Sequence, residues 1–276
     1  MKLAFVTCVQ LGKSCIEKIL DMGGKLDLLI TLKDEKAKNK SGRIYLDDIS
    51  EKNQIPLLKI NNVNDFEVIE ALKKYEIDWL FIIGWSQIAK EELLKTPKKG
   101  CIGMHPTLLP LGRGRASIPW AIIKGLDKTG VTMFKLNEGV DTGEILGQIE
   151  IPLSQNTTAS ELYDEVDKTH IKLIKKYWKE IIEDKLILKK QNEEKATYWE
   201  GRKPEDGEIT EKMTVEEAER LVRAVTHPYP GAFYIKGKEK VIIWSSQIVE
   251  NSQERTIKLK NGYLLPIDYE IENIEV

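Results

Sequence analysis

A short apolar segment in the middle of the first half sets the strongest constraint on how this chain folds. Residues 78–84 read Asp-Trp-Leu-Phe-Ile-Ile-Gly, and the central side chains are apolar without alternation. A strand with one solvated face alternates apolar and polar residues, whereas a strand covered on both faces is apolar throughout. Residues 78–84 are therefore predicted to form a strand buried between two layers.

Similar apolar runs alternate with segments of helical spacing. Strands are predicted at residues 3–8, 26–32, 56–60, 78–84 and 101–105, and helices at residues 13–22, 44–53 and 65–75. This order is typical of βαβ units, so we expect an α/β fold with a Rossmann-like, mostly parallel sheet and helices on both faces. In such sheets ligands bind beyond the carboxyl ends of the strands. Gly84 and His105 end two predicted strands and fall at that edge.

The second half of the chain changes character. Two more strands are predicted at residues 131–136 and 145–151, followed by a long helix at 157–182. Thr214 and Glu217 have capping-box spacing, which indicates the start of another helix. Short alternating runs then indicate a small β-rich, OB-like domain. We therefore expect a large domain over residues 1–184, a charged linker over 185–204 and a small domain over 205–276. Residues 33–43 are expected to be a charged loop.

Composition excludes several classes of protein. The chain has 42 Lys and Arg against 44 Asp and Glu, so it lacks the basic excess of a general nucleic-acid binder. Three cysteines without a C-x-x-C pair, and three histidines, predict no zinc site and fit a reducing compartment. The apolar start is too short for a signal peptide, and no apolar run reaches about 18 residues. We expect a cytoplasmic protein without a membrane partner.

Residues 101–146 carry the densest motifs. Four short sequences occur in order: HPTLLP from His105, RGR from Arg113, TGVT from Thr129 and GVDTG from Gly139. Glycines and prolines at this density make tight backbone turns rather than a packed core. A histidine and an aspartate framed by such turns can be held rigidly at a pocket.

This ordered set resembles the folate-dependent formyltransferase family. The family includes methionyl-tRNA formyltransferase, glycinamide ribonucleotide formyltransferase and the nucleotide-sugar N-formyltransferases. His105 and Asp141 are 36 positions apart, as in the family. Residues 223–233 look like the segment that opens the family's C-terminal domain, and the resemblance covers roughly residues 1–235.

The resemblance implies transfer of a formyl group from N10-formyltetrahydrofolate to an amine. His105 would stabilise the oxyanion, a contribution of about 3–4 kcal/mol for one such donor. Asp141 would orient His105, favour its protonated form and accept the amine proton directly or through water. The residues implied at the folate site are Gly84, Trp85, Gln87, Ile88, Val140 and Asp141. Those implied at the acceptor site are Lys13, Thr107, Arg113, Gly114 and Arg115, with no metal.

One position departs from the family pattern. The family usually has asparagine two residues before the histidine, where its amide donates to the formyl oxygen, and this chain has Gly103. Three alternatives follow. Gln87 or Ser86 replaces the amide, a water or a backbone N–H replaces it, or turnover is weak. The first two are favoured because His105 and Asp141 both remain.

The acceptor follows from exclusion together with family likeness. Residues 201–276 hold 11 Lys and Arg against 14 Asp and Glu, which is unfavourable for gripping tRNA. Glycinamide ribonucleotide enzymes normally end before such a domain. The sequence RGRA from Arg113 is similar to the sugar-acting branch. We expect a nucleotide-linked amino sugar used for surface glycans, with a homodimer as one possible assembly. The alternatives are methionyl-tRNA formylation and a folate- or nucleotide-binding protein with little turnover.

Overall fold

The fold was analysed in a computed structural model that describes residues 1–37 and 42–274. The chain divides into two compact units. Unit 1 comprises Met1–Arg113, Gly130–Ile151 and Val166–Tyr198, and unit 2 comprises Gly114–Thr129, Pro152–Glu165 and Trp199–Val276. No helix in the described ranges is long and apolar enough to span a bilayer.

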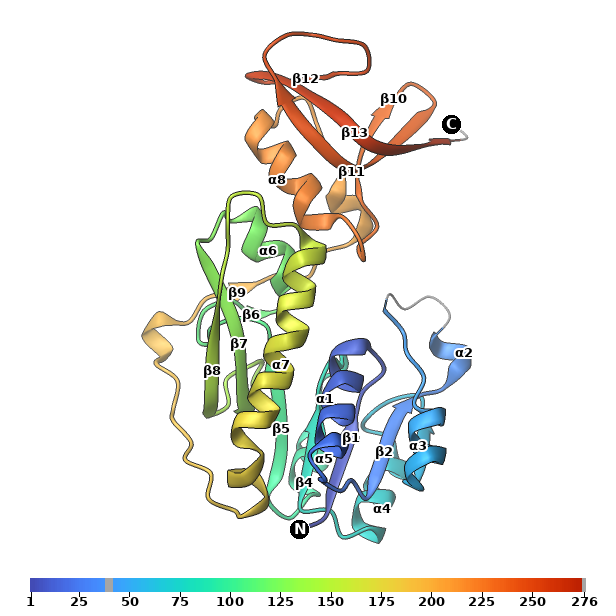
Figure 1. Cartoon of the computed structure of the whole chain (residues 1–276), viewed down its shortest axis with the longest axis vertical. Coiled ribbons are helices and arrows are strands. Elements are labelled where there is room, and N and C mark those ends of the chain that lie inside the picture. Colours follow the sequence, from blue (N-terminus) through green and yellow to red (C-terminus); the bar gives the residue numbers. More distant parts are fainter. Residues whose placement is uncertain (38–41, 275–276) are drawn as a thin grey trace. The chain divides into compact units, whose positions relative to one another are not determined.

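A mostly parallel sheet forms the centre of unit 1 (Figure 1). Its strand order is β3 (Leu57–Ile60), β2 (Leu28–Leu32), β1 (Leu3–Val6), β4 (Trp79–Ile82), β5 (Gly100–His105), β7 (Lys128–Lys135) and β8 (Ile145–Pro152). The pairs among β1 to β5 are parallel, whereas β5 and β7 are antiparallel. The α/β fold expected from the sequence is confirmed.

Strand β4 contains the centre of the apolar run at residues 78–84. All four of its residues are buried, which confirms the predicted two-sided burial. Because alternate residues point to opposite faces, Phe81 faces one layer and stacks on Phe5 of β1 at 5.5 Å between ring centroids. Leu80 and Ile82 face the other layer, in a core cluster with apolar residues of α4 and α5.

Helices cover both faces of this sheet. Those of unit 1 are α1 (Gln10–Asp21), α2 (Asp34–Ala37), α3 (Asp47–Asn53), α4 (Phe66–Lys74) and α5 (Glu91–Lys95), and α7 (Ala159–Ile182) belongs largely to it. Helices α1 and α7 lie side by side over one face (Figure 1), where Ser14 Oγ donates to Asp167 Oδ2 at 2.9 Å. Residues 33–43 were expected to be a loop, but α2 lies within them, and residues 38–41 lie outside the described part.

Unit 2 contains α6 (Ser117–Ile123), a 3-10 turn at Pro204–Gly207, α8 (Val215–Val225) and an antiparallel sheet. That sheet has the order β10 (Ala232–Lys236), β11 (Glu239–Val249), β13 (Gly262–Asn273) and β12 (Ile257–Leu259). Thr214 caps α8, and Thr214 and Glu217 form the reciprocal capping box, which confirms that reading of the sequence. The β-rich C-terminal part of the fold is confirmed as well.

The strand order places the ends of β1, β4 and β5 at one edge of the sheet. The order reverses direction between β1 and β4, the position where ligands bind in sheets of this kind. Gly84 follows β4 with φ +66°, and a Cβ added there would lie 2.3 Å from Val9 Cγ2. Glycine is required at this turn, because the loops after β1 and β4 approach too closely for a side chain.

Candidate active site

His105 is the last residue of β5 and is 8% exposed. Its Nε2 atom lies 2.8 Å from the carbonyl oxygen of Gly112. A carbonyl oxygen can only accept, so Nε2 carries a proton and donates it to Gly112. The other ring nitrogen, Nδ1, is then the atom of His105 that is left for chemistry.

Asp141 faces that nitrogen from the loop between β7 and β8. Its Oδ2 atom lies 3.7 Å from His105 Nδ1, within ion-pair range but longer than a hydrogen bond. The two side chains are 10% and 19% exposed, so both remain accessible to a small molecule. The structure therefore brings together the histidine and the aspartate that the motifs singled out.

The loop after His105 is held by residues of β7 and β8. Thr132 Oγ1 accepts from the Leu109 amide at 3.0 Å and donates to the Thr107 carbonyl at 2.7 Å. Gln148 Nε2 donates to the Leu109 carbonyl at 2.8 Å. The last threonine of the TGVT motif thus has a structural reason: it fixes the turn that carries His105.

Leu136 occupies the space beside Gly103. A Cβ added at Gly103 would lie 2.7 Å from Leu136 Cδ2. The position where the family usually has an amide donor is therefore next to an apolar side chain. Ser86 and Gln87 were proposed replacements. The amide of Gln87 is engaged elsewhere: Oε1 accepts from Val63 N at 2.8 Å, and Nε2 donates to Asn61 O at 3.0 Å.

Two residues expected at the folate site are apolar and exposed. Ile88 is 71% exposed and Val140 is 47% exposed. They lie on the loop after β4 and on the Asp141 loop, the two loops singled out for folate. Trp85 is partly buried, packs against the core cluster, and its Nε1 donates to Gln87 Oε1 at 3.3 Å.

Arg113 has a different environment from the acceptor contact that the resemblance implies. Its side chain is fully buried, and all of its N–H groups have acceptors. Nε and Nη2 donate to Gln191 Oε1 at 3.2 and 2.8 Å, Nη1 and Nη2 donate to Glu193 at 2.8 and 2.7 Å, and Nη1 donates to Tyr198 at 2.8 Å. No N–H group remains for a ligand. The hydrogen bonds to Glu193 and Tyr198 raise the pKa of Arg113 despite its burial.

The remaining acceptor-site candidates differ in exposure. Arg115 is exposed, whereas Lys13 is half-buried and lies 4.0 Å from Glu17. Thr107 is buried, and its Oγ1 has no hydrogen-bond partner among the described residues. Gly114 has φ +111°, and a Cβ there would lie 2.3 Å from the Trp199 carbonyl. The positive φ and the close Trp199 carbonyl therefore require glycine at position 114.

The sequence did not single out Gln191, Glu193, Thr197 or Tyr198. All four lie in or next to the segment expected to be a linker, and no local pattern marks them. Burial lowers the pKa of His170 to about 4, so this imidazole is neutral at pH 7 and adds no charge near His105. Within the described ranges, no group of three or more His, Cys, Asp or Glu side chains is arranged to hold a metal.

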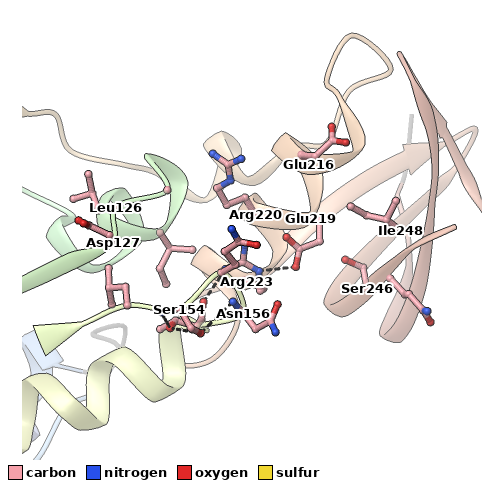
Figure 2. A pocket seen from close by; sticks show the side chains of 16 residues that line it. Leu126, Asp127, Ser154, Asn156, Glu216, Glu219, Arg220, Arg223, Ser246 and Ile248 are labelled. Atoms are coloured by element: carbon pink, nitrogen blue, oxygen red, sulfur yellow. Dashed lines mark hydrogen bonds and ion pairs between the residues drawn. The ribbon is translucent and has the colours of Figure 1, made fainter.

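Unit 2 contains a separate polar cavity of about 690 Å³ (Figure 2). Its lining includes neither His105 nor Asp141. Arg223 at its centre donates to Glu219 at 2.5 Å and to the Thr157 carbonyl at 2.8 Å. Arg220 reaches the Ile123 carbonyl at 3.5 Å. The cavity is large, but it lacks His105 and Asp141, and its two arginines already bond to protein atoms. We therefore do not assign the reaction to it.

Comparison with known proteins identifies the family. Residues 9–177 match the model of the formyl transferase family, and residues 202–269 match the model of its C-terminal domain. The chain is 30% identical over 260 residues to methionyl-tRNA formyltransferase of Clostridioides difficile, covering 93% of this chain and 84% of that protein. The chain therefore belongs to the formyl transferase family, whose enzymes depend on N10-formyltetrahydrofolate.

Two other similar proteins are not named as methionyl-tRNA formyltransferases. The chain is 30% identical over 266 residues to the bifunctional polymyxin resistance protein ArnA of Wigglesworthia glossinidia brevipalpis, covering 96% of this chain and 40% of that protein. Its fold matches the N-formyltransferase from Helicobacter canadensis solved with folinic acid and dTDP-3-aminofucose, at a TM-score of 0.74 and 21% identity, over 98% of this chain and 100% of that one. The acceptor is left open between tRNA and a nucleotide sugar.

The contact between Gly103 and Leu136 predicts a coupled pair. Gly103→Asn alone should lower the free energy of unfolding by about 1–3 kcal/mol, because the added atoms overlap Leu136. In the double variant with Leu136→Ala, the two costs should be less than additive by about 1 kcal/mol. Urea unfolding measures this, with Gly201→Asn as the control, because a Cβ there would make an ordinary contact of 3.6 Å with Arg115 Cδ. Strict additivity would contradict the packing described.

The environment of Arg113 predicts a contrast with its neighbour Arg115. Arg113→Met should lower the free energy of unfolding by roughly 1.5–3 kcal/mol, because the buried guanidinium loses its charged hydrogen bonds to Gln191, Glu193 and Tyr198. Arg115→Met removes an exposed guanidinium and should change it by less than about 0.5 kcal/mol. Denaturant unfolding of both variants tests the contrast, and equal stabilities would refute the structural role of Arg113.

Proposed function

We propose that this chain transfers a formyl group from N10-formyltetrahydrofolate to the amine of a nucleotide-linked amino sugar, with His105 and Asp141 as the catalytic residues. The observation that carries the proposal is the pairing of His105 Nδ1 with Asp141 Oδ2 at 3.7 Å, beyond the carboxyl end of β5. Fixing Nε2 on Gly112 leaves Nδ1 to act on a substrate held at this edge.

The proposed chemistry is an acyl transfer. The neutral amine attacks the formyl carbon, and the carbonyl electrons move to oxygen, giving a tetrahedral oxyanion. Protonated His105 donates from Nδ1 to that oxyanion. Asp141 accepts the proton lost by the amine, directly or through one water. The oxyanion then collapses and the bond from carbon to N10 breaks. N10 takes up the proton that Asp141 accepted, directly or through water, so that tetrahydrofolate and the formamide leave and the carboxylate is regenerated.

Support for the folate position comes from the two loops beside the pair. Ile88 and Val140 expose apolar side chains that a flat heteroaromatic ring would cover. Gly84, Trp85, Gln87 and Asp141 complete the proposed donor site. The side chain of Gln87 fixes the loop rather than pointing its amide at a ligand, so we assign it a supporting role.

Support for a sugar acceptor comes from charge. The C-terminal segment from residue 201 has 14 acidic residues against 11 basic ones, which disfavours a polyanionic tRNA. Arg115, with Lys13, Thr107 and Gly114, is proposed to contact the acceptor. The identity to a methionyl-tRNA formyltransferase keeps tRNA as the second candidate.

We further propose that residues 1–184 act as the catalytic domain, 185–204 as a connecting segment and 205–276 as a small C-terminal domain, in a cytoplasmic protein. The three cysteines are free and buried, which fits a reducing compartment. Burial raises the pKa of Cys101 to about 12, so this thiol is unreactive at neutral pH.

Replacing the catalytic histidine should abolish transfer without unfolding the protein. His105→Ala should lower kcat by about 10²–10³-fold, because the oxyanion loses its charged donor. Turnover is followed by the release of tetrahydrofolate, and circular dichroism reports the fold. His227→Ala, in unit 2, is the matched control and should retain activity. Near-normal turnover by His105→Ala would exclude the proposed mechanism.

A panel of acceptors separates the candidate functions. The protein and N10-formyltetrahydrofolate are incubated with nucleotide-linked amino sugars, with methionyl-tRNA and with no acceptor. Mass spectrometry should detect a gain of one formyl group on a nucleotide-linked amino sugar only. Formylation of methionyl-tRNA, weakening with salt, would favour the second candidate. Donor binding without transfer to any acceptor would favour a binding protein, as Gly103 suggests.

A further inference from the structure

Contacts with the end of β7 and with a segment outside the loop hold the Asp141 turn. Asp141 has φ +54°, the left-handed region that residues other than glycine seldom adopt. Such a conformation persists only where surrounding contacts hold it. Two residues later, a Cβ added at Gly143 would lie 1.7 Å from the Lys135 carbonyl. The turn therefore packs tightly against the end of β7.

Gln191 supplies the support from the opposite direction. Its Nε2 atom donates to the carbonyls of Asp141 and Gly143, at 2.7 Å in each case. Both hydrogens of this amide nitrogen are thereby used on the two carbonyls that flank the turn. The amide oxygen accepts from Arg113 Nε and Nη2. This network assigns the orientation of the amide, because only its oxygen can face a guanidinium.

Arg113 anchors Gln191 to the protein interior. The guanidinium is fully buried and also pairs with Glu193 and Tyr198. A planar guanidinium with every donor engaged has little freedom to rotate. The rigid, buried guanidinium therefore fixes the position of Gln191, and Gln191 in turn fixes the position of the Asp141 carbonyl.

The same segment also reaches the support of His105. The Gly112 amide donates to Thr197 Oγ1 at 2.8 Å, and the Arg113 amide donates to the Thr197 carbonyl at 2.9 Å. Gly112 in turn accepts from His105 Nε2. The Thr197 amide also donates to the Pro110 carbonyl at 3.2 Å. Residues 191–198 thus hold three backbone contacts on the histidine side and two on the aspartate side.

We propose that residues 191–198, anchored on Arg113, form a clamp that sets the distance between His105 and Asp141, with Gln191 as the positioning residue for Asp141. This inference rests on the proposed function for its catalytic consequence, but the clamp itself is a structural property that can be tested without an acceptor. The Gln191 side chain bonds to the backbone carbonyls of Asp141 and Gly143, so it acts on the Asp141 carboxylate through the backbone of the turn.

Two substitutions separate positioning from general stability. Gln191→Glu keeps an oxygen acceptor for Arg113 but places a second oxygen against the two carbonyls, so the loop must move while the anchor is kept. Gln191→Met removes both functions. We expect kcat to fall about 10- to 100-fold in both variants, with a smaller change in KM for the formyl donor. Only Gln191→Met should also lower the unfolding midpoint. Gln253→Glu, an exposed site, is the control for the added charge.

Nuclear magnetic resonance provides a readout independent of turnover. The chain has only three histidines, so the ring nitrogens of His105 can be resolved. The wild type should show a protonated Nε2. In Gln191→Glu, the Nδ1 signal of His105 and the amide signals of Asp141 and Gly143 should shift, while those of His227 stay in place.

The outcomes distinguish the two proposals. Unchanged spectra and wild-type kcat for Gln191→Glu would overturn the clamp, as would a loss of activity confined to the destabilised Gln191→Met. If the wild type transfers no formyl group to any acceptor, the proposed function fails. The amide and imidazole shifts would then still decide whether residues 191–198 hold the Asp141 loop.

Discussion

The hydrogen bond from His105 Nε2 to the Gly112 carbonyl determines how the rest of the site can work. It places a proton on Nε2 in both protonation states and leaves Nδ1 as the only nitrogen that changes. Neutral His105 presents a lone pair at Nδ1, and protonated His105 presents an N–H group there. Asp141 Oδ2 stands on the same side, 3.7 Å from Nδ1.

That arrangement requires two loops to keep their separation, and different contacts hold each loop. The turn after His105 is bonded to Thr132 and Gln148 of the neighbouring strands. The Asp141 turn receives two hydrogen bonds from Gln191, 50 positions from Asp141. The segment that contains Gln191 also holds the histidine side, because Thr197 accepts from the Gly112 amide. The buried guanidinium of Arg113 anchors that segment.

The sequence predicted the sheet, its two-sided burial and the meeting of His105 with Asp141, because local pattern and ordered motifs carry that information. The apolar run of β4 and the capping box of Thr214 are signals within a few residues. The role of Arg113 could not be predicted this way. Its partners lie 78 to 85 positions away in a charged segment without periodicity. From sequence alone, an arginine in a glycine-rich motif is more readily assigned to a phosphate than to a buried anchor.

The contact between Gly103 and Leu136 affects which residues stabilise the oxyanion and which residue accepts the amine proton in the proposed reaction. An amide at position 103 would share the negative charge of the oxyanion, but the space beside Gly103 is apolar. In the proposed reaction His105 donates to that oxygen, and Ser86, a water or a backbone N–H is the candidate second donor. In the proposed reaction His105 donates a hydrogen to the oxyanion, so it does not also accept the proton of the amine. The proposal therefore assigns the role of base to Asp141, and the position of its carboxylate matters more than in a site with an amide donor. A base must be held in position, and the clamp on the Asp141 turn supplies that support.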